Sequence, residues 1–404
     1  MQSPIPELRG EDPVFGAGWA LYEIDLGVDD EGPVVASLVH RERGVTPLAD
    51  WDSGRGRRDP EQRHAVQQRH AVEQRHVVKQ GRSVEQGRSV EQGHSGEQRH
   101  VVGQHDGDQA DAHVHQQGPH GDDPAAPPPI LVLHGWSDYV LDRHLLDRLG
   151  EQGHDVWGLD LRKHGRSLRA GQTPTEIDHL NRYDEEIGAA LRLIGRPPVI
   201  LAHSTGGLTA TLYAQRHPRT IRALALNSPW LEMHLGAVVR GLLHRPVGGL
   251  ARRRGARRIL PVGMPHYART THRNWGGRFD YELDWKPPGG HAFPADTLAA
   301  VLDGQRRLEA AGPLAIPVLV LRSDRSVVGP VFTESMRRAD TVLDVRTMTR
   351  AACRLGSDVQ IDVIPGARHD VFLSDADARA RAITALERWL RALSPAAYDV
   401  PERT

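Results

Sequence analysis

Cysteine, aromatic residues and long apolar runs are all scarce in this 404-residue sequence. The one cysteine, Cys353, excludes a disulfide within the chain, and its place in a predicted helix indicates packing rather than reactivity. No run of about 18 or more apolar residues occurs, so no membrane-spanning helix is expected. The N-terminal residues are acidic and proline-containing and include no apolar segment, which argues against a secretory signal peptide. Together these absences favour a cytoplasmic protein.

The charges also lack an excess of either sign. Lys and Arg number 51 and Asp and Glu number 52, which leaves a formal net charge of -1. Proteins that bind nucleic acid usually carry a strongly basic surface, so no nucleic-acid partner is expected. The dense basic run is Arg252–Arg258, which we interpret as a solvated surface. Contact of that run with an anionic substrate or a phospholipid surface is the alternative.

The most regular feature that is present is a repeat, because residues 61–102 consist of seven near-identical hexads. A step of six residues turns a helix by about 600°, so the valines fall on changing faces and form no apolar stripe. A hexapeptide β-solenoid would align them but would have too little core. We therefore predict a disordered insertion over residues 51–128. Histidines such as His64 and His70 recur in it, but a flexible tract fixes no metal geometry, so no metal site is expected.

The insertion lies between two expected strands, Gly32–His40 and Ile130–Leu133, which we expect to be neighbours joined by a short connection in a compact domain. Lengthening a loop from about 10 to about 85 residues costs only about 2 kcal/mol of closure entropy, so the fold tolerates it. The predicted organisation follows, with residues 1–50, 129–228 and 314–404 forming the core. Residues 229–313 are too long for an ordinary connection and are expected to form a cap.

Strand-like and helix-like segments alternate along the rest of the chain, which indicates an α/β fold with a mostly parallel sheet. The expected strands are residues 154–159, 200–203, 223–226, 317–321 and 359–363. The expected helices are residues 174–194, 346–355 and 375–393, the last with Ser374 as its N-cap. In the cap, Leu231, Leu235, Val238 and Leu242 make an apolar helix face. This face either packs on the core or lines a substrate pocket.

One octet predicts nucleophilic chemistry. Ile200–Gly207 is an apolar strand that runs into His203 and Ser204, followed by small residues and a helix-like stretch. A serine hydroxyl attacks only when a base takes its proton, and a sharp strand-to-helix turn exposes it for that purpose. Gly206 allows the helix to approach the strand closely, and Ala202 stands where the commoner pattern has its first glycine. The octet is therefore interpreted as a nucleophile elbow with Ser204 as the nucleophile.

Four further segments resemble α/β-hydrolases, and more narrowly their monoglyceride-lipase and lysophospholipase branch with its serine-aminopeptidase-like members. His134–Tyr139 is similar to the family's His-Gly loop, and Asp160–Ser167 to its Asp-x-Arg-x-x-Gly-x-Ser loop. The segments around Asn227 and Trp285 fit bacterial members of the branch. The resemblance covers about residues 12–48 and 128–394. It implies an α/β-hydrolase fold with a helical cap.

The resemblance also implies site residues in the order oxyanion loop, nucleophile, acid, base. The oxyanion donors would be the backbone N–H groups of Trp136 and Thr205. His369, on the loop after the last expected strand, is the predicted general base. For Asp160 and Arg166 we expect an ion pair that shapes their loop rather than a role in catalysis.

The acid is open between three carboxylates. Asp324 follows the strand 317–321 directly, but it lies 45 residues before His369. Asp340 lies 29 residues before His369, and the expected helix 346–355 and strand 359–363 occupy that interval without surplus chain. We favour Asp340, with Asp324 and then Asp344 as alternatives. The carboxylates that are not the acid are expected to cap loops.

These residues predict a serine hydrolase that cleaves carboxylic esters through an acyl-enzyme, with Ser204, His369 and Asp340 as its triad. The expected substrate is a small-molecule ester with an apolar acyl chain, and no cofactor is needed. A serine-aminopeptidase-like peptidase is the alternative enzyme, although no anionic clamp for a free amine stands out in the sequence. A hydrolase fold that only binds ligands is the non-enzymatic alternative.

Overall fold

The computed structural model of the chain describes residues 4–42, 44, 126–233, 259–260 and 266–393. The hexad repeat, the basic run Arg252–Arg258 and three of the four residues of the predicted apolar cap face lie outside these residues. Within the described part of the chain, no helix is long and apolar enough to cross a membrane.

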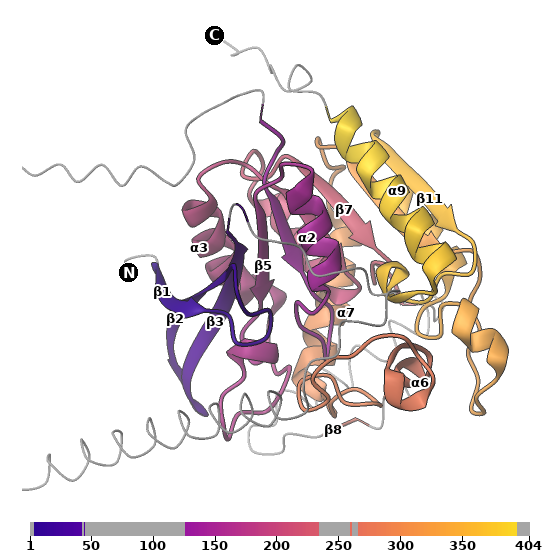
Figure 1. Cartoon of the computed structure of the whole chain (residues 1–404), viewed down its shortest axis with the longest axis horizontal. Helices are drawn as coiled ribbons and strands as arrows, with labels where there is room; N and C mark the ends of the chain where they lie inside the picture. The colour runs from indigo at the N-terminus through magenta and orange to yellow at the C-terminus, as the bar shows by residue number, and fades with distance from the viewer. Residues whose placement is uncertain (1–3, 43, 45–125, 234–258, 261–265, 394–404) are drawn as a thin grey trace, which may run out of the picture. The chain divides into compact units, whose positions relative to one another are not determined.

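The core is a nine-stranded sheet in the order β1-β2-β3-β5-β4-β6-β7-β10-β11 (Figure 1). Its strands are β1 (Pro6–Glu11), β2 (Trp19–Asp29), β3 (Gly32–Arg41), β4 (Ile130–Leu133), β5 (Val156–Asp160), β6 (Val199–His203), β7 (Ala223–Asn227), β10 (Val318–Ser323) and β11 (Val359–Ile364). The three N-terminal strands pair in an antiparallel manner, and β3 joins them to β5. From β5 to β11 all neighbours are parallel. The expected α/β-hydrolase fold is confirmed.

Helices cover both faces of this sheet. The helices that do so are α2 (Arg143–Glu151), α3 (Asp184–Ile194), α4 (Thr205–Arg216), α7 (Ala295–Ala310), α8 (Val345–Ala352) and α9 (Ala376–Ala392), while the short helix α6 (Tyr267–Thr271) belongs to neither layer. Successive strand residues point to opposite faces, so Leu201 packs in one apolar layer while its neighbours Ile200 and Ala202 pack in the other. The layer with Leu201 is completed by α2 and α9, and the other by α3, α4, α7 and α8. Figure 1 shows α2 and α9 together in front of the sheet.

Shorter elements complete the described chain. The 3-10 helices are η2 (Gly165–Ser167), η3 (Leu180–Tyr183), η4 (Arg273–Trp275), η5 (Glu334–Arg338) and η6 (Val371–Leu373). A two-stranded sheet pairs β8 (Ile259–Leu260) with β9 (Phe293–Pro294). The predicted cap range 229–313 includes α7, whose buried Ala300 and Val301 share an apolar layer with Leu208 of α4.

The expectation that strands 32–40 and 130–133 are neighbours is wrong, because β5 lies between them. A parallel pair needs a crossover, here α2, and this brings β5 back beside β3. The imidazole of His40 stacks on the indole of Trp157 at 3.8 Å between ring centroids, and its Nε2 lies 2.8 Å from Asp155 Oδ1. These contacts fix β3 against β5.

Three local predictions also need correction. The expected helix 174–194 is α-helical only from Asp184, because η3 precedes it and the residues before η3 form a loop in which Thr175 has φ 65° and donates its N–H to the Lys163 carbonyl at 3.0 Å. Ser374 is not the N-cap of α9; Asp375 is, and the Ser374 hydroxyl instead accepts the Arg368 N–H at 2.9 Å. Cys353 is exposed at the C-cap of α8 and is therefore not a packing residue.

Candidate active site

The predicted elbow at Ser204 is a strained turn between β6 and α4. Ser204 has φ 53° and ψ -117°, a backbone region that a residue with a side chain adopts only when its surroundings hold it there. Its N–H donates to the Asn227 carbonyl and its carbonyl accepts from the Trp230 N–H, both at 3.0 Å. A Cβ on Gly206 would lie 2.2 Å from the His134 carbonyl oxygen, so only glycine allows α4 to pass this close to the end of β4. The predicted close approach of helix and strand at Gly206 is thus made to the end of β4 and not to the strand that carries Ser204.

Three side chains from three distant segments form one hydrogen-bonded chain beside this turn. The Ser204 Oγ lies 3.0 Å from His369 Nε2, and His369 Nδ1 lies 2.9 Å from Asp340 Oδ2. The exposed fractions are 8% for Ser204, 2% for His369 and 0% for Asp340. Such distances suit proton transfer from a hydroxyl to an imidazole that a carboxylate orients.

The position of Asp340 agrees with both arguments about the acid, namely its spacing to His369 and its closeness to the preceding strand. After β10 the chain leaves the sheet edge and returns, so that Asp340 pairs with Ser326 in a short parallel bridge. The surplus chain therefore lies before Asp340, which comes back beside the end of β10. The second oxygen of Asp340 accepts the N–H groups of Val342 and Leu343, each at 2.8 Å, which fixes the carboxylate in place.

The two alternative acids, Asp324 and Asp344, cap local structure, which was the expectation for the less favoured carboxylates. Asp324 accepts the N–H of Gly366 at 2.8 Å, on the turn that precedes His369. Asp344 is the N-cap of α8 and accepts the N–H of Thr347 at 2.7 Å. The carboxylate that the structure places on the His369 imidazole is that of Asp340.

The loop that carries His369 is held by residues that the sequence did not single out for this task. Asn227, at the end of β7, donates its amide to Asp370 Oδ1 at 2.7 Å and accepts the Val371 N–H at 3.1 Å. The Ser323 hydroxyl, at the end of β10, donates to the Ala367 carbonyl at 2.6 Å. The signal available in the sequence was that these polar residues end strands next to the predicted catalytic loop. They fix the imidazole relative to the sheet.

The His-Gly loop lies against the elbow. A Cβ on Gly135 would lie 3.0 Å from the Ser204 Cβ, so the backbone of this loop approaches the nucleophile closely. The Trp136 indole donates to Thr175 Oγ1 at 2.9 Å and stacks on Phe293 at 4.4 Å between ring centroids. The other predicted donor, the Thr205 N–H, is in the first turn of α4, where N–H groups have no partner within the helix.

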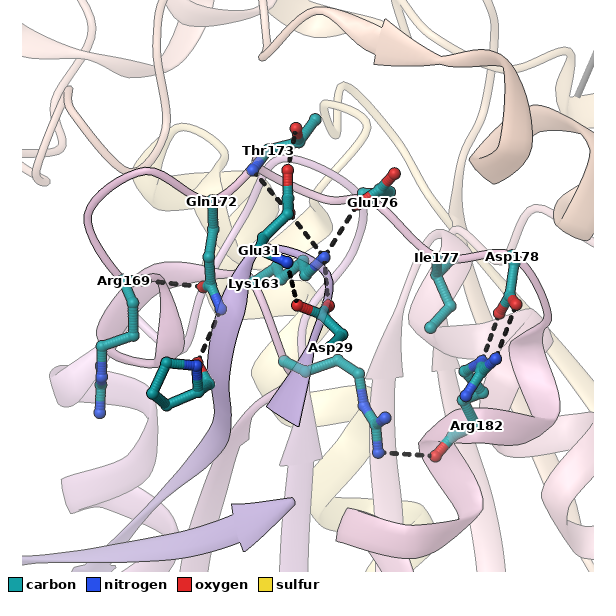
Figure 2. A network of polar contacts seen from close by, with 12 residues as sticks. Asp29, Glu31, Lys163, Arg169, Gln172, Thr173, Glu176, Ile177, Asp178 and Arg182 are labelled. Atoms are coloured by element: carbon teal, nitrogen blue, oxygen red, sulfur yellow. Dashed lines mark hydrogen bonds and ion pairs between the residues drawn. The ribbon is translucent and has the colours of Figure 1, made fainter. Parts of the chain in front are cut away.

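The loop after β5, residues 161–176, is a region of paired charges beside the site. As predicted, Arg166 forms an ion pair with Asp160 at 2.9 Å, and it also binds Asp12. Burial would lower the pKa of this guanidinium, but the two carboxylates raise it above its usual range. Lys163 contacts three carboxylates, those of Asp29, Glu31 and Glu176 (Figure 2). This loop is a structural support, and the Trp136 indole bonds to it through Thr175.

A cavity of about 280 Å³ opens onto Ser204 and His369. Its apolar wall consists of Trp136, Trp230, Phe293, Val328, Met336, Val342 and Leu343. Polar side chains, among them Tyr267 and His266, line it as well. Among the described residues, the Tyr267 hydroxyl, the Trp230 Nε1 and both ring nitrogens of His266 are buried without a hydrogen-bond partner. Burial raises the pKa of the Tyr267 phenol well above its usual range, so this group is a neutral donor.

One carboxylate next to the cavity was missed by the sequence analysis. Asp138, on the His-Gly loop, accepts from Lys286 Nζ at 2.5 Å and lies 3.1 Å from His203 Nδ1. Burial alone would raise the pKa of the Asp138 carboxyl, but the Lys286 charge and the His203 hydrogen bond hold it well below its usual range. Asp138 is therefore ionised. Lys286 belongs to a segment that the sequence had matched to the family without assigning it a role.

In residues 4–42, 126–233 and 266–393, no three His, Cys, Asp or Glu side chains are grouped in a way that could hold a metal ion. His134 belongs to the backbone scaffold, because its Nε2 accepts the Leu161 N–H at 3.0 Å and its Nδ1 lies 2.7 Å from the Gly135 carbonyl oxygen. Burial lowers the pKa of this imidazole, which favours its neutral form.

Comparisons with known proteins agree with this architecture. The chain is 27% identical over 255 residues to a monoacylglycerol lipase of Mycolicibacterium smegmatis, which covers 60% of this chain and 81% of that protein. It is 28% identical over 268 residues to lysophospholipase L2 of Escherichia coli, which covers 61% of this chain and 75% of that protein.

Two solved structures share the fold. The monoacylglycerol lipase of Paleococcus ferrophilus superposes with a TM-score of 0.52 at 19% identity over 67% of this chain and 97% of that one. A monoglyceride lipase of Saccharomyces cerevisiae gives 0.50 at 16% identity over 67% and 88%. The model of the serine aminopeptidase family S33 matches residues 125–377, more than half of the 404 residues. The chain therefore belongs to the serine aminopeptidase (S33) family of α/β-hydrolases.

Proposed function

We propose that this protein is a serine hydrolase that cleaves carboxylic esters through an acyl-enzyme intermediate. The observation that carries the proposal is the hydrogen-bonded chain from Ser204 Oγ through the His369 imidazole to Asp340 at 3.0 and 2.9 Å. Ser204 and His369 open onto a cavity, next to the loop that supplies the Trp136 N–H. Similarity to a monoacylglycerol lipase and a lysophospholipase supports ester substrates.

In the proposed mechanism, His369 Nε2 takes the Ser204 proton while the Ser204 oxygen attacks the ester carbonyl carbon. The negative charge that develops on the carbonyl oxygen is stabilised by the N–H groups of Trp136 and Thr205. His369 then donates its proton to the leaving alcohol, and a water molecule activated by the same imidazole releases the acid. Asp340 holds the imidazole with Nδ1–H toward the carboxylate and stabilises the imidazolium.

The cavity lining supports an ester with an apolar acyl group as the substrate. Two indole rings and one phenyl ring, those of Trp136, Trp230 and Phe293, form a continuous aromatic wall next to the nucleophile. Aromatic and aliphatic walls gain free energy by removing apolar substrate surface from water. No cofactor takes part in this mechanism, since the leaving group is an alcohol and the nucleophile belongs to the chain.

An aminopeptidase activity would need a carboxylate to bind the free amine of a peptide. Among the described residues that line the cavity, Asp138 is the one carboxylate, and its oxygens are already occupied by Lys286 and His203. The geometry therefore favours esters over peptides with a free N-terminus.

The test is a substrate panel with the purified full chain. We expect hydrolysis of p-nitrophenyl esters from acetate to palmitate, stoichiometric labelling by a fluorophosphonate probe, and no release of p-nitroaniline from aminoacyl anilides. Release of p-nitroaniline at rates similar to ester cleavage would favour the peptidase. Absence of both labelling and turnover would favour a fold that only binds ligands.

A further inference from the structure

A second chain of polar side chains lies beside the proposed triad. It runs from the Lys286 ammonium through the Asp138 carboxylate to the imidazole of His203, the residue before the nucleophile. Side-chain exposure is 5% for Lys286, 5% for Asp138 and 11% for His203. The ammonium also lies over the rings of Tyr267 and Tyr281, at 5.2 and 5.5 Å from their centroids. Three polar groups are thus removed from water together.

The hydrogen bonds indicate the charge of His203. An ionised Asp138 can only accept, so the ring nitrogen that faces it, Nδ1, carries the proton. The other nitrogen, Nε2, is buried and has no hydrogen-bond partner among the described residues. An unpaired buried N–H⁺ costs considerably more free energy than an unpaired lone pair. The arrangement therefore favours a neutral His203, with Lys286 as the counter-charge of Asp138.

The charge of His203 matters because its ring lies 4.9 Å from the ring of His369, measured between centroids. During the proposed reaction His369 becomes an imidazolium. A second imidazolium at this distance would oppose that step by direct repulsion. A neutral neighbour does not.

We propose that Lys286 acts as a positioning residue that keeps His203 uncharged by neutralising Asp138, and so allows His369 to take the Ser204 proton. The inference rests on the proposed function, because it concerns the base of that same reaction. It assigns the Lys286 charge to the protein's own chemistry and not to the binding of an anionic substrate.

Other titratable groups around His203 are consistent with this assignment. From the main cavity it is faced by His369 and by the phenol of Tyr267, which burial keeps neutral. A smaller cavity of about 50 Å³ is lined by His203 together with His134, Asp138, Tyr139 and Asp370. The Asp370 carboxylate already accepts from the Asn227 amide at 2.7 Å and from the Phe372 N–H at 2.9 Å. Lys286 is thus the cation placed to balance Asp138 among these groups.

The decisive variant is Lys286→Met. Without the ammonium, Asp138 has His203 as its remaining cationic partner, so His203 takes up a proton as the pH falls. We expect kcat for a p-nitrophenyl ester to fall on the order of 10²-fold below wild type at pH 6 and to recover toward wild type at pH 9. KM should change little. A loss of the same size at every pH, or a rise in KM alone, would overturn the proposal.

Two further variants test the charge itself. Lys286→Arg keeps the cation and should keep the wild-type pH profile. The double variant with Asp138→Asn added to Lys286→Met removes both charges. Its kcat should therefore no longer show the additional fall at low pH, and its activity at pH 6 should recover. Failure of the double variant to regain activity would show that Lys286 acts in another way. Lys163→Met is the matched control, because it removes a buried lysine from a different carboxylate cluster and should leave the pH profile unchanged.

A measurement on the wild-type protein covers the case in which Lys286→Met does not fold. Ring-¹⁵N NMR, with the His203 signals assigned by their loss in His203→Gln, should show a neutral ring protonated at Nδ1 between pH 6 and 8. A charged His203 in this range would contradict the inference. Absence of ester hydrolysis by the wild type would instead count against the proposed function, so the two failures are distinguishable.

Discussion

The loop after β5 and the cavity beside Ser204 both lie at the carboxyl ends of parallel strands. They differ in how completely their buried polar groups are paired. In the loop, each of Arg162, Lys163 and Arg166 binds two or more carboxylates. At the cavity, Lys286 has the one carboxylate of Asp138, and several buried polar atoms have no partner within the described residues.

This difference in pairing distinguishes the loop, which supports the fold, from the cavity, where the proposed reaction takes place. Removing charges from water is costly unless each charge has several partners, so a fully paired cluster keeps one conformation and has no group left to bind a ligand. Unpaired buried donors such as the Tyr267 hydroxyl cost stability in the free protein. Tyr267 and His266 line the cavity, whereas Lys163 belongs to the fully paired cluster of the loop after β5.

Removal of the proposed nucleophile should have the largest effect on activity. Ser204→Ala should lower kcat by about 10⁴-fold or more and abolish fluorophosphonate labelling, because Ser204 supplies the one hydroxyl that contacts the His369 imidazole among the described residues. Thermal unfolding should be unchanged. Ser228→Ala is the matched control, since the Ser228 hydroxyl is buried without a hydrogen-bond partner in the described structure. Retention of a tenth of wild-type activity by Ser204→Ala would contradict the assignment.

Replacement of the acid should come next. Asp340→Asn should leave the His369 imidazole in the wrong tautomer and lower kcat by up to about 10⁴-fold at neutral pH. Asp324→Asn is the matched control and should cost little activity, because Asp324 contacts the Gly366 N–H and not the imidazole. Near-normal kcat in Asp340→Asn together with a collapse in Asp324→Asn would reverse the two roles.

Glu31, a partner of the supporting loop after β5, should make the free energy of unfolding depend on pH without affecting ester hydrolysis. Burial would raise its pKa, but hydrogen bonds from Lys163 and Thr173 lower it to about 2. Because the pKa in the folded state is below the usual value of 4.5, its contribution is complete above that pH and is lost as the pH falls toward 2.

Glu31→Gln should therefore lower Tm by about 5 °C at pH 7, and this difference should shrink on acidification to pH 3. The activity of the folded variant should match wild type. The measurement is calorimetry of both proteins across that range. A Tm difference that stays constant with pH would show that Glu31 stabilises the fold through packing and not through its charge.

The smallest effect is expected from the hexad repeat. Replacing residues 55–122 with a short Gly/Ser linker should leave Tm and kcat nearly unchanged, because the repeat offers no apolar face to the hydrolase core. Calorimetry and an ester assay of the deletion variant test this. A loss of several degrees in Tm, or aggregation, would mean that the repeat packs on the core.

Much of the site could be predicted from local pattern. An apolar strand followed by His203, Ser204 and small residues predicts an elbow, because few other local structures need a glycine two residues after a serine. The prediction of a short parallel strand at residues 200–203 and of the β11 strand before His369 agrees with the structure. Asp340, His369 and Ser204 come together in the structure with the spacing that was favoured.

Other features could not be found in this way, because they join segments without a local pattern. The start of the helix near residue 184 depends on the Lys163 carbonyl, which binds Thr175. The place of β5 between β3 and β4 depends on a crossover and on the pairing of whole strands. Likewise, Asn227 and Ser323 gain their roles only from the loop that lies above them.

By itself the sequence determined the fold class, the strand-to-helix turn at Ser204 and the loop that carries His369, the proposed base, because periodicity and strand-to-turn patterns act over a few neighbouring residues. Tertiary structure alone decided how the chain between Asp324 and Asp340 returns to the sheet, and it alone joined Lys286 to His203 through Asp138. Those groups lie far apart in the sequence. Their charges interact only after folding has removed water from between them, and no local pattern encodes that distance.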